Sequence, residues 1–158
     1  MLRLANFFAT GFYSGYLPRV PGTWGSAVAA VLAFALVSVA PSLSSVDGAI
    51  FLAAAVTLAA VVAAHYVWSR KLYGPDAHDP QQIVIDEFAG YFVSIIGARP
   101  QALSFVLAFL FFRMFDISKP YPCRRLEKLS GGFGIVMDDI MAGIYACAAV
   151  NIVEALLF

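Results

Sequence analysis

Acidic residues in apolar surroundings are the first feature of this sequence that could do chemistry. The chain contains 10 Asp and Glu residues, and four of them have the surroundings of ordinary loop or helix-end charges: Asp47, Asp76, Glu127 and Glu154. The other six are Asp79, Asp86, Glu87, Asp116, Asp138 and Asp139. In an apolar segment an ionised carboxylate is costly unless it meets a cation, a hydrogen-bond donor or water, so such residues indicate a functional site.

Two pairs of adjacent acids stand in strings that resemble each other. Asp86-Glu-Phe-Ala-Gly90 matches Asp139-Ile-Met-Ala-Gly143 at the Asp, Ala and Gly positions. Helical spacing gives each string one face of mostly small residues: Asp86, Gly90, Ser94 and Gly97 on one, and Asp139, Gly143, Ala146 and Val150 on the other. Small residues let membrane helices approach closely. We therefore expect the two faces to pack together and to bring the carboxylate pairs near one another.

Carboxylates that converge in a site of low polarity repel one another unless a cation holds them. Ligands that are all oxygen atoms suit a hard cation, and Mg²⁺ is favoured because it binds carboxylates together with substrate phosphate groups. The expected metal ligands are Asp86, Glu87, Asp138 and Asp139. The alternative interpretation is that the acids form salt bridges with basic residues, namely Arg113, Lys119 and Arg124.

Basic, hydroxyl and glycine residues near these acids could bind the oxygens of a phosphate group. Arg113 and Lys119 flank Asp116, and an arginine can hold two phosphate oxygens at once. Hydroxyls and free N–H groups at a helix start can also bind phosphate, and glycines let the backbone approach a ligand. Helix capping explains the hydroxyls equally well, and loop flexibility explains the glycines equally well. The expected phosphate-binding residues are Thr23, Ser26, Arg113, Lys119, Gly132 and Gly134.

The two histidines differ in their surroundings. His65 lies in an apolar segment, which is typical of a core residue, whereas His78 lies in an acidic loop and could transfer a proton near neutral pH. The candidate catalytic residues are Asp86, Asp116, Asp139 and His78.

The composition shows what must hold these residues. Of 158 residues, 61% are hydrophobic and 13% are charged, against about 45–50% and about 25% in soluble domains. We expect a single membrane-embedded domain over residues 1–158. A net charge of zero argues against nucleic acid as a partner.

Apolar runs predict an all-α, polytopic membrane bundle with about five membrane-embedded helices. The runs are 26–40, 48–69, 83–98, 102–112 and 140–158, and the second is long enough to cross a hydrocarbon core of about 30 Å. Asp79 fits a helix N-cap, so the helix that carries Asp86 is expected to begin at Pro80. Apolar residues at helical spacing predict an amphipathic helix before Gly22.

Basic residues set the expected orientation in the membrane. With the N-terminus inside, nine of the 10 Lys and Arg residues face the cytoplasm and only Arg99 falls outside, as the positive-inside rule predicts. The candidate site residues then all lie at the cytoplasmic face.

Several strings together resemble the phosphatidylglycerophosphatase A family. They follow one another along most of the chain, at 9–15, 21–26, 78–79, 83–90, 112–122 and 131–143. One departure is Ser130, where the family often has His, so no proton-transfer role is assigned there. Glu127-Lys128 also replaces an Asp-Arg pair.

The resemblance implies an all-helical, Mg²⁺-dependent hydrolase of a bacterial inner membrane. Its phospholipid substrate would be phosphatidylglycerophosphate, and its products phosphatidylglycerol and inorganic phosphate. Attack by a metal-activated water and a covalent aspartyl-phosphate both fit the residues. We favour water, because several acids are assigned to the metal.

Two other functions also use carboxylates inside membrane helices. An ion- or proton-coupled transporter would distribute its acids across the membrane depth, whereas here they cluster at one expected face. A lipid-headgroup transferase would use the same metal chemistry, but the Asp-Gly and spaced Asp signature of the alcohol phosphotransferases is missing.

Overall fold

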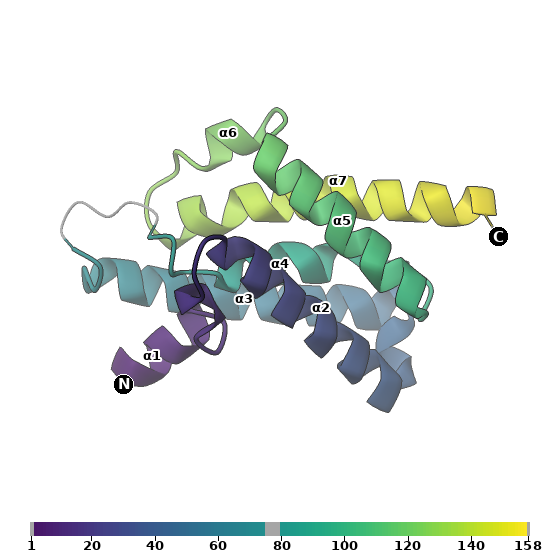
Figure 1. Ribbon diagram of the computed structural model, residues 1–158, viewed down its shortest axis with the longest axis horizontal. Coiled ribbons are helices and arrows are strands. Elements are labelled where there is room, and N and C mark those ends of the chain that lie inside the picture. Colours follow the sequence, from purple (N-terminus) through teal and green to yellow (C-terminus); the bar gives the residue numbers. More distant parts are fainter. Residues whose placement is uncertain (1, 75–79, 158) are drawn as a thin grey trace.

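The computed structural model describes residues 2–74 and 80–157, and every regular element in these ranges is a helix (Figure 1). The predicted all-α fold class is thereby confirmed. The elements, with η marking 3-10 helices, are α1 (Leu2–Ala9), η1 (Ser14–Tyr16), α2 (Pro21–Val39), η2 (Pro41–Ser44), α3 (Val46–Ser69), α4 (Ile85–Ser94), α5 (Ala102–Ser118), α6 (Cys123–Leu126) and α7 (Gly132–Leu157). His78 and Asp79 lie outside the described residues.

Helices α2, α3 and α7 are long and apolar enough to cross a membrane, with 19, 24 and 26 residues. At 1.5 Å per residue their lengths are roughly 28–39 Å, against a hydrocarbon core of about 30 Å. Helices α4 and α5, with 10 and 17 residues, are shorter. Of the about five embedded helices expected, three therefore have a spanning length. Large apolar side chains such as Val31, Phe51 and Leu58 are exposed, which suits a surface that meets lipid.

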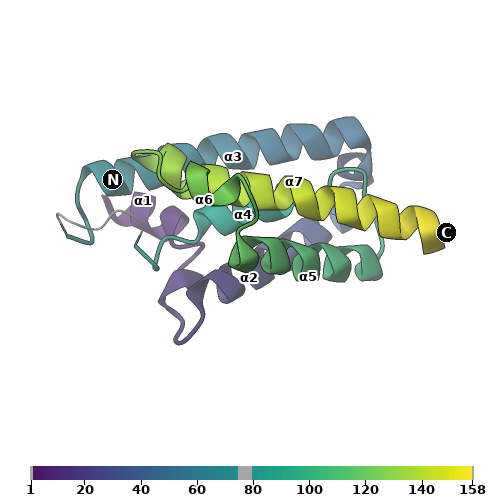
Figure 2. The same ribbon diagram turned by 90° about the horizontal axis from the view of Figure 1, so that it is seen from above.

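Helix α4 lies inside the bundle, in contact with α2, α3, α5 and α7 (Figures 1 and 2). Nine of its ten residues are buried, and Val93 is the exception. A helix of this length is not stable alone, so the surrounding helices must hold it. The acids of its first turn are consequently enclosed by protein on several sides.

The start of α4 differs from the sequence prediction. The helix begins at Ile85, not at Pro80, because residues 80–84 are drawn into other contacts. The Ile83 N–H donates to the Pro80 carbonyl at 2.8 Å, and the Val84 N–H donates to the Ala9 carbonyl at the end of α1 at 2.9 Å. Asp86 and Glu87 therefore lie in the first turn of α4 and not nearly two turns inside a helix.

The N-terminal amphipathic helix is present as α1, but it ends at Ala9. The chain then turns through Gly11, Phe12 and Tyr13, all with positive φ. Helix α7 is longer than predicted: it begins at Gly132, eight residues before the predicted run 140–158.

Helices α4 and α7 cross at two glycines, as the matching strings predict. A Cβ added to Gly90 would lie 2.5 Å from the Asp139 carbonyl oxygen, and one added to Gly143 would collide with the Gly90 carbonyl. Only glycine permits this approach. The prediction that the two small-residue faces pack together is confirmed.

The far end of α4 is held by Glu154, which corrects its interpretation as an ordinary helix-end charge. Glu154 is 4% exposed. Its carboxylate accepts hydrogen bonds from the Arg99 backbone N–H at 3.1 and 3.2 Å and from the Ser104 hydroxyl. Backbone donors in apolar surroundings need such an acceptor. Glu154 thus fixes the turn between α4 and α5 against α7.

Candidate active site

Charged side chains gather in a cavity of about 360 Å³ at the end of the bundle where α2 and α4 begin and α5 ends. Its lining comprises Arg19, Val20, Pro21, Gly22, Thr23, Gln81, Ile83, Asp86, Glu87, Arg113, Asp116, Ile117, Lys119, Asp138 and Asp139. Five of the six acids singled out in the sequence are among these residues. The sixth, Asp79, is outside the described residues.

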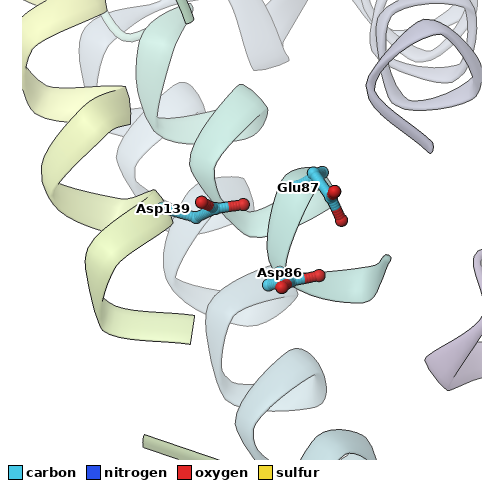
Figure 3. Close-up of side chains that lie close together, drawn as sticks. All are labelled: Asp86, Glu87 and Asp139. Carbon is cyan, nitrogen blue, oxygen red and sulfur yellow. The ribbon is translucent and has the colours of Figure 1, made fainter. Parts of the chain in front are cut away.

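Three of these acids form a compact carboxylate group. Asp86, Glu87 and Asp139 each offer an oxygen, and these oxygens all lie within 4.8 Å of one another (Figure 3). The three residues are 8%, 9% and 4% exposed. Asp86 and Glu87 occupy the first turn of α4, where the helix dipole favours negative charge. Asp139 comes from α7, beside the crossing at Gly90.

The chemistry of this carboxylate trio fits a magnesium ion. The ligand atoms are all oxygen, which hard cations prefer. Within the described part of the chain, Glu87 Oε2 is buried and accepts no hydrogen bond. A buried carboxylate oxygen without a donor is costly, and a cation removes that cost. Asp86, Glu87 and Asp139 are therefore the residues that would hold Mg²⁺.

Asp138, the fourth expected metal ligand, has a different partner. Lys119 Nζ donates to Asp138 Oδ2 at 2.9 Å and lies 3.0 Å from Glu127 Oε1. Burial lowers the pKa of Lys119, but the hydrogen bonds to Asp138 and Glu127 outweigh burial and raise the pKa above its usual value. Adjacent side chains on a helix point about 100° apart, so Asp138 and Asp139 meet different groups.

Arg113 connects three helices at the cavity. It pairs with Asp116 one turn further along α5, and its Nη1 lies 3.9 Å from Glu87 Oε1 on α4. The same nitrogen lies 3.4 Å from the Ser26 hydroxyl on α2. The salt-bridge interpretation of the acids thus holds for Asp116 and Asp138, and in part for Glu87.

The expected phosphate-binding residues separate into two groups. Thr23, Arg113 and Lys119 line the cavity, and Ser26 stands behind it in contact with Arg113. At Gly22, beside Thr23, a Cβ would collide with Glu87 Oε1. The beginning of α2 is therefore pressed against the acids of α4.

Gly132 and Gly134 do not line the cavity. A Cβ on Gly132 would lie 2.6 Å from the backbone nitrogen of His65 and from the carbonyl oxygen of Val61, both on α3. A Cβ on Gly134 would collide with the Leu129 carbonyl. Their small size serves packing at the start of α7. The sequence alone does not distinguish glycines that approach a ligand from glycines that approach another helix.

The cavity includes residues that the sequence analysis did not single out as ligands, notably Arg19 and Gln81. In the sequence, Arg19 counts only as one of the basic residues on the expected cytoplasmic side. Its position two residues before Pro21, at the start of the helix that carries Thr23, is the signal that could have identified it.

Comparison with known proteins identifies the family to which this cavity belongs. The phosphatidylglycerophosphatase A model matches residues 7–154. The chain belongs to the phosphatidylglycerophosphatase A family. Family membership makes it an enzyme that hydrolyses a phosphate monoester. No solved structure matches the chain.

Three curated relatives of this phosphatidylglycerophosphatase A family member cover nearly its full length. A Haemophilus influenzae protein named phosphatidylglycerophosphatase A is 36% identical, over 98% of this chain and 91% of its own. Escherichia coli phosphatidylglycerophosphatase A is 31% identical, over 90% and 81%. A Bacteroides thetaiotaomicron protein, provisionally named a phosphatidylinositol-3-phosphatase, is 34% identical, over 90% and 89%.

Proposed function

We propose that this protein hydrolyses phosphatidylglycerophosphate to phosphatidylglycerol and inorganic phosphate with the help of Mg²⁺, as a step of glycerophospholipid synthesis. One observation carries the proposal. The buried trio of Asp86, Glu87 and Asp139 shares a cavity with Arg113 and Lys119. Metal-binding carboxylates beside fixed cations provide for both the metal and the phosphate oxygens.

The proposed roles fall to the trio, Arg113, Lys119, Thr23 and Asp116. Mg²⁺ held by the trio would neutralise phosphate charge and activate a water for attack on phosphorus. Arg113 and Lys119 donate hydrogen bonds to the oxygens of the phosphate monoester, and the Thr23 hydroxyl donates at the start of α2. Asp116, whose carboxylate is paired with Arg113, accepts the proton of the attacking water. The P–O bond to glycerol breaks, and the glycerol oxygen takes up the proton that Asp116 received from the water.

We further infer a multi-pass protein of the bacterial inner membrane with its cavity facing the cytoplasm. Its relatives are bacterial, and three helices have spanning length. The basic residues support the orientation: Arg19, Arg113 and Lys119 line the cavity, whereas Arg99 lies in the turn at the opposite end of α4. The positive-inside rule places the cavity end in the cytoplasm.

An inositol lipid that carries a phosphate monoester is the second candidate substrate. The relative provisionally named a phosphatidylinositol-3-phosphatase supports it. The transporter interpretation is weaker. Glu154, the buried acid at the far end of α7, is satisfied by Arg99 and Ser104 and does not extend the cavity acids into a path across the membrane.

Phosphate release from a panel of lipids tests the proposal. Purified protein in mixed micelles is given phosphatidylglycerophosphate, phosphatidic acid or phosphatidylinositol 3-phosphate, with Mg²⁺ or with excess EDTA. We expect the highest kcat/KM for phosphatidylglycerophosphate, and no turnover in EDTA until Mg²⁺ is restored. A preference for the inositol lipid would select the second candidate. Full turnover in EDTA, with no metal found by elemental analysis, would overturn the metal assignment.

A further inference from the structure

Three cations line the cavity, and two of them are already paired with acids. Arg113 pairs with Asp116 and approaches Glu87, and Lys119 is held by Asp138 and Glu127. Arg19 is the third. It is exposed, and within the described ranges it forms no ion pair and its side chain makes no hydrogen bond. Its guanidinium is therefore available for a ligand that enters the cavity.

Arg19 stands at the rim of the cavity on a loop that is held in place. Its backbone has a φ of 75°, which costs a residue with a side chain free energy unless its surroundings impose it. Trp24 Nε1 donates to the Pro18 carbonyl at 3.4 Å, and the Val20 N–H donates to the same oxygen at 3.1 Å. These contacts tie the loop to the first turn of α2.

Exposed apolar residues lie close to Arg19 in the sequence. Leu17, Val20 and Trp24 are 44%, 50% and 45% exposed. Tryptophan beside aliphatic residues is typical of a protein surface at the level of lipid headgroups. A lipid that reaches the cavity from this side would bring its acyl chains past these residues and its headgroup past Arg19.

Both candidate substrates carry two phosphate groups with different chemistry. The monoester is hydrolysed, and the phosphodiester next to the diacylglycerol remains in the product. If the trio, Arg113 and Lys119 take the monoester, the diester lies further out, on the side of the acyl chains. We propose that Arg19 binds this phosphodiester and is a specificity-determining residue for lipids whose headgroup is attached through a phosphodiester. This inference rests on the proposed function. The fork of an arginine matches two non-bridging oxygens.

Product binding separates the two phosphate positions. Dihexanoyl-phosphatidylglycerol carries the diester alone, and inorganic phosphate represents the monoester site. Isothermal titration calorimetry gives the Kd of each for the wild-type protein, Arg19→Gln and Arg19→Lys in detergent with Mg²⁺. Loss of a charged hydrogen-bonded contact predicts that Arg19→Gln weakens phosphatidylglycerol binding about ten- to one hundred-fold. The Kd of phosphate should change by less than about two-fold, and Arg19→Lys should fall between Arg19→Gln and the wild type.

Lys71→Gln is the matched control. Lys71 is also exposed, has a φ of 49°, and does not line the cavity. It should leave both Kd values unchanged. Equal weakening of both ligands by Arg19→Gln, no weakening of either, or an equal effect of Lys71→Gln on phosphatidylglycerol would overturn the inference.

Kinetic measurements distinguish a failure of this inference from a failure of the proposed function. Arg19→Gln should lower kcat/KM for phosphatidylglycerophosphate more than for phosphatidic acid, which has no phosphodiester. A wild-type protein that releases phosphate from no lipid would contradict the proposed function. The phosphatidylglycerol titration would still decide the role of Arg19.

Discussion

Asp138 and Asp139 are neighbours in the sequence but differ in their partners. Lys119 Nζ lies 2.9 Å from Asp138, whereas Asp139 meets the carboxylates of Asp86 and Glu87. Asp116 resembles Asp138 in this respect, because it pairs with a basic residue, Arg113. An acid that is paired with a cation can orient that cation toward a phosphate group. Asp86, Glu87 and Asp139, whose oxygens converge, are the acids that a metal ion would hold.

Replacing a trio carboxylate by its amide tests the metal ligands. Asp86→Asn and Asp139→Asn should each lower the rate of phosphate release by about a thousand-fold or more, because metal catalysis contributes several kcal/mol. The folded structure should persist, and its melting temperature should stay the same or rise as like charges no longer crowd. Lipid phosphatase rates beside thermal melting in detergent check both expectations.

Asp138→Asn is the matched control for these two variants. It should reduce the rate without changing the Mg²⁺ concentration that gives half-maximal activity, because Asp138 binds Lys119. If either trio variant kept a near-normal rate, the two-helix metal site would have to be abandoned.

Helix pairing was predictable from the sequence, and helix boundaries were not. The string Asp-x-x-Ala-Gly predicts where a second helix packs, because its glycine lies one helical turn from the acid and permits close approach. The start of α4 depends on a hydrogen bond between Val84 and Ala9, which are far apart in the sequence. No sequence pattern near Pro80 predicts this hydrogen bond.

Residue roles were predictable to a similar extent. The acids of the site were identifiable because carboxylates are costly in apolar segments. Glu154 was misinterpreted because its donors, Arg99 and Ser104, come from another segment of the chain. The position of Arg19 in the cavity was missed because a basic residue before a helix looks like an ordinary surface charge.

The crossing of α4 and α7 predicts the effect of a larger residue at Gly90. Gly90→Leu should damage both folding and activity, because any side chain meets Phe112 and the Asp139 carbonyl. Overpacking of this kind costs about 1–3 kcal/mol or more. Melting in detergent and the phosphatase rate should fall together. A variant that is fully stable and active would show that the two helices can separate without loss.

The turn between α4 and α5 makes its own prediction. Glu154→Leu leaves the Arg99 N–H and the Ser104 hydroxyl without their acceptor, so it should destabilise the protein by about 1–3 kcal/mol. Asp47→Leu, at an exposed acid in the first turn of α3, is the control and should have a smaller effect. Chemical denaturation in detergent compares the two. Equal stabilities would show that Glu154 does not hold the turn.

At the scale of the whole molecule, the distribution of basic residues predicts which loops face the cytoplasm. We expect the segment between α5 and α7 to lie inside and the turn at Arg99 outside. Single cysteines are placed at Ser118 and Arg99 after replacement of Cys123 and Cys147, the two native cysteines. A membrane-impermeant thiol reagent applied outside intact inner membranes should label position 99 alone. Labelling at 118 but not at 99 would reverse the orientation.

Helix α7 holds both ends of the buried segment that carries Asp86 and Glu87. Asp139 meets the first turn of α4, and Glu154 holds the turn that follows it. These two residues of α7 are separated by about 22 Å along one continuous helix. One continuous helix therefore sets the distance between these two contacts. Because one helix makes both contacts, a tilt of α7 would move the two ends of α4 together.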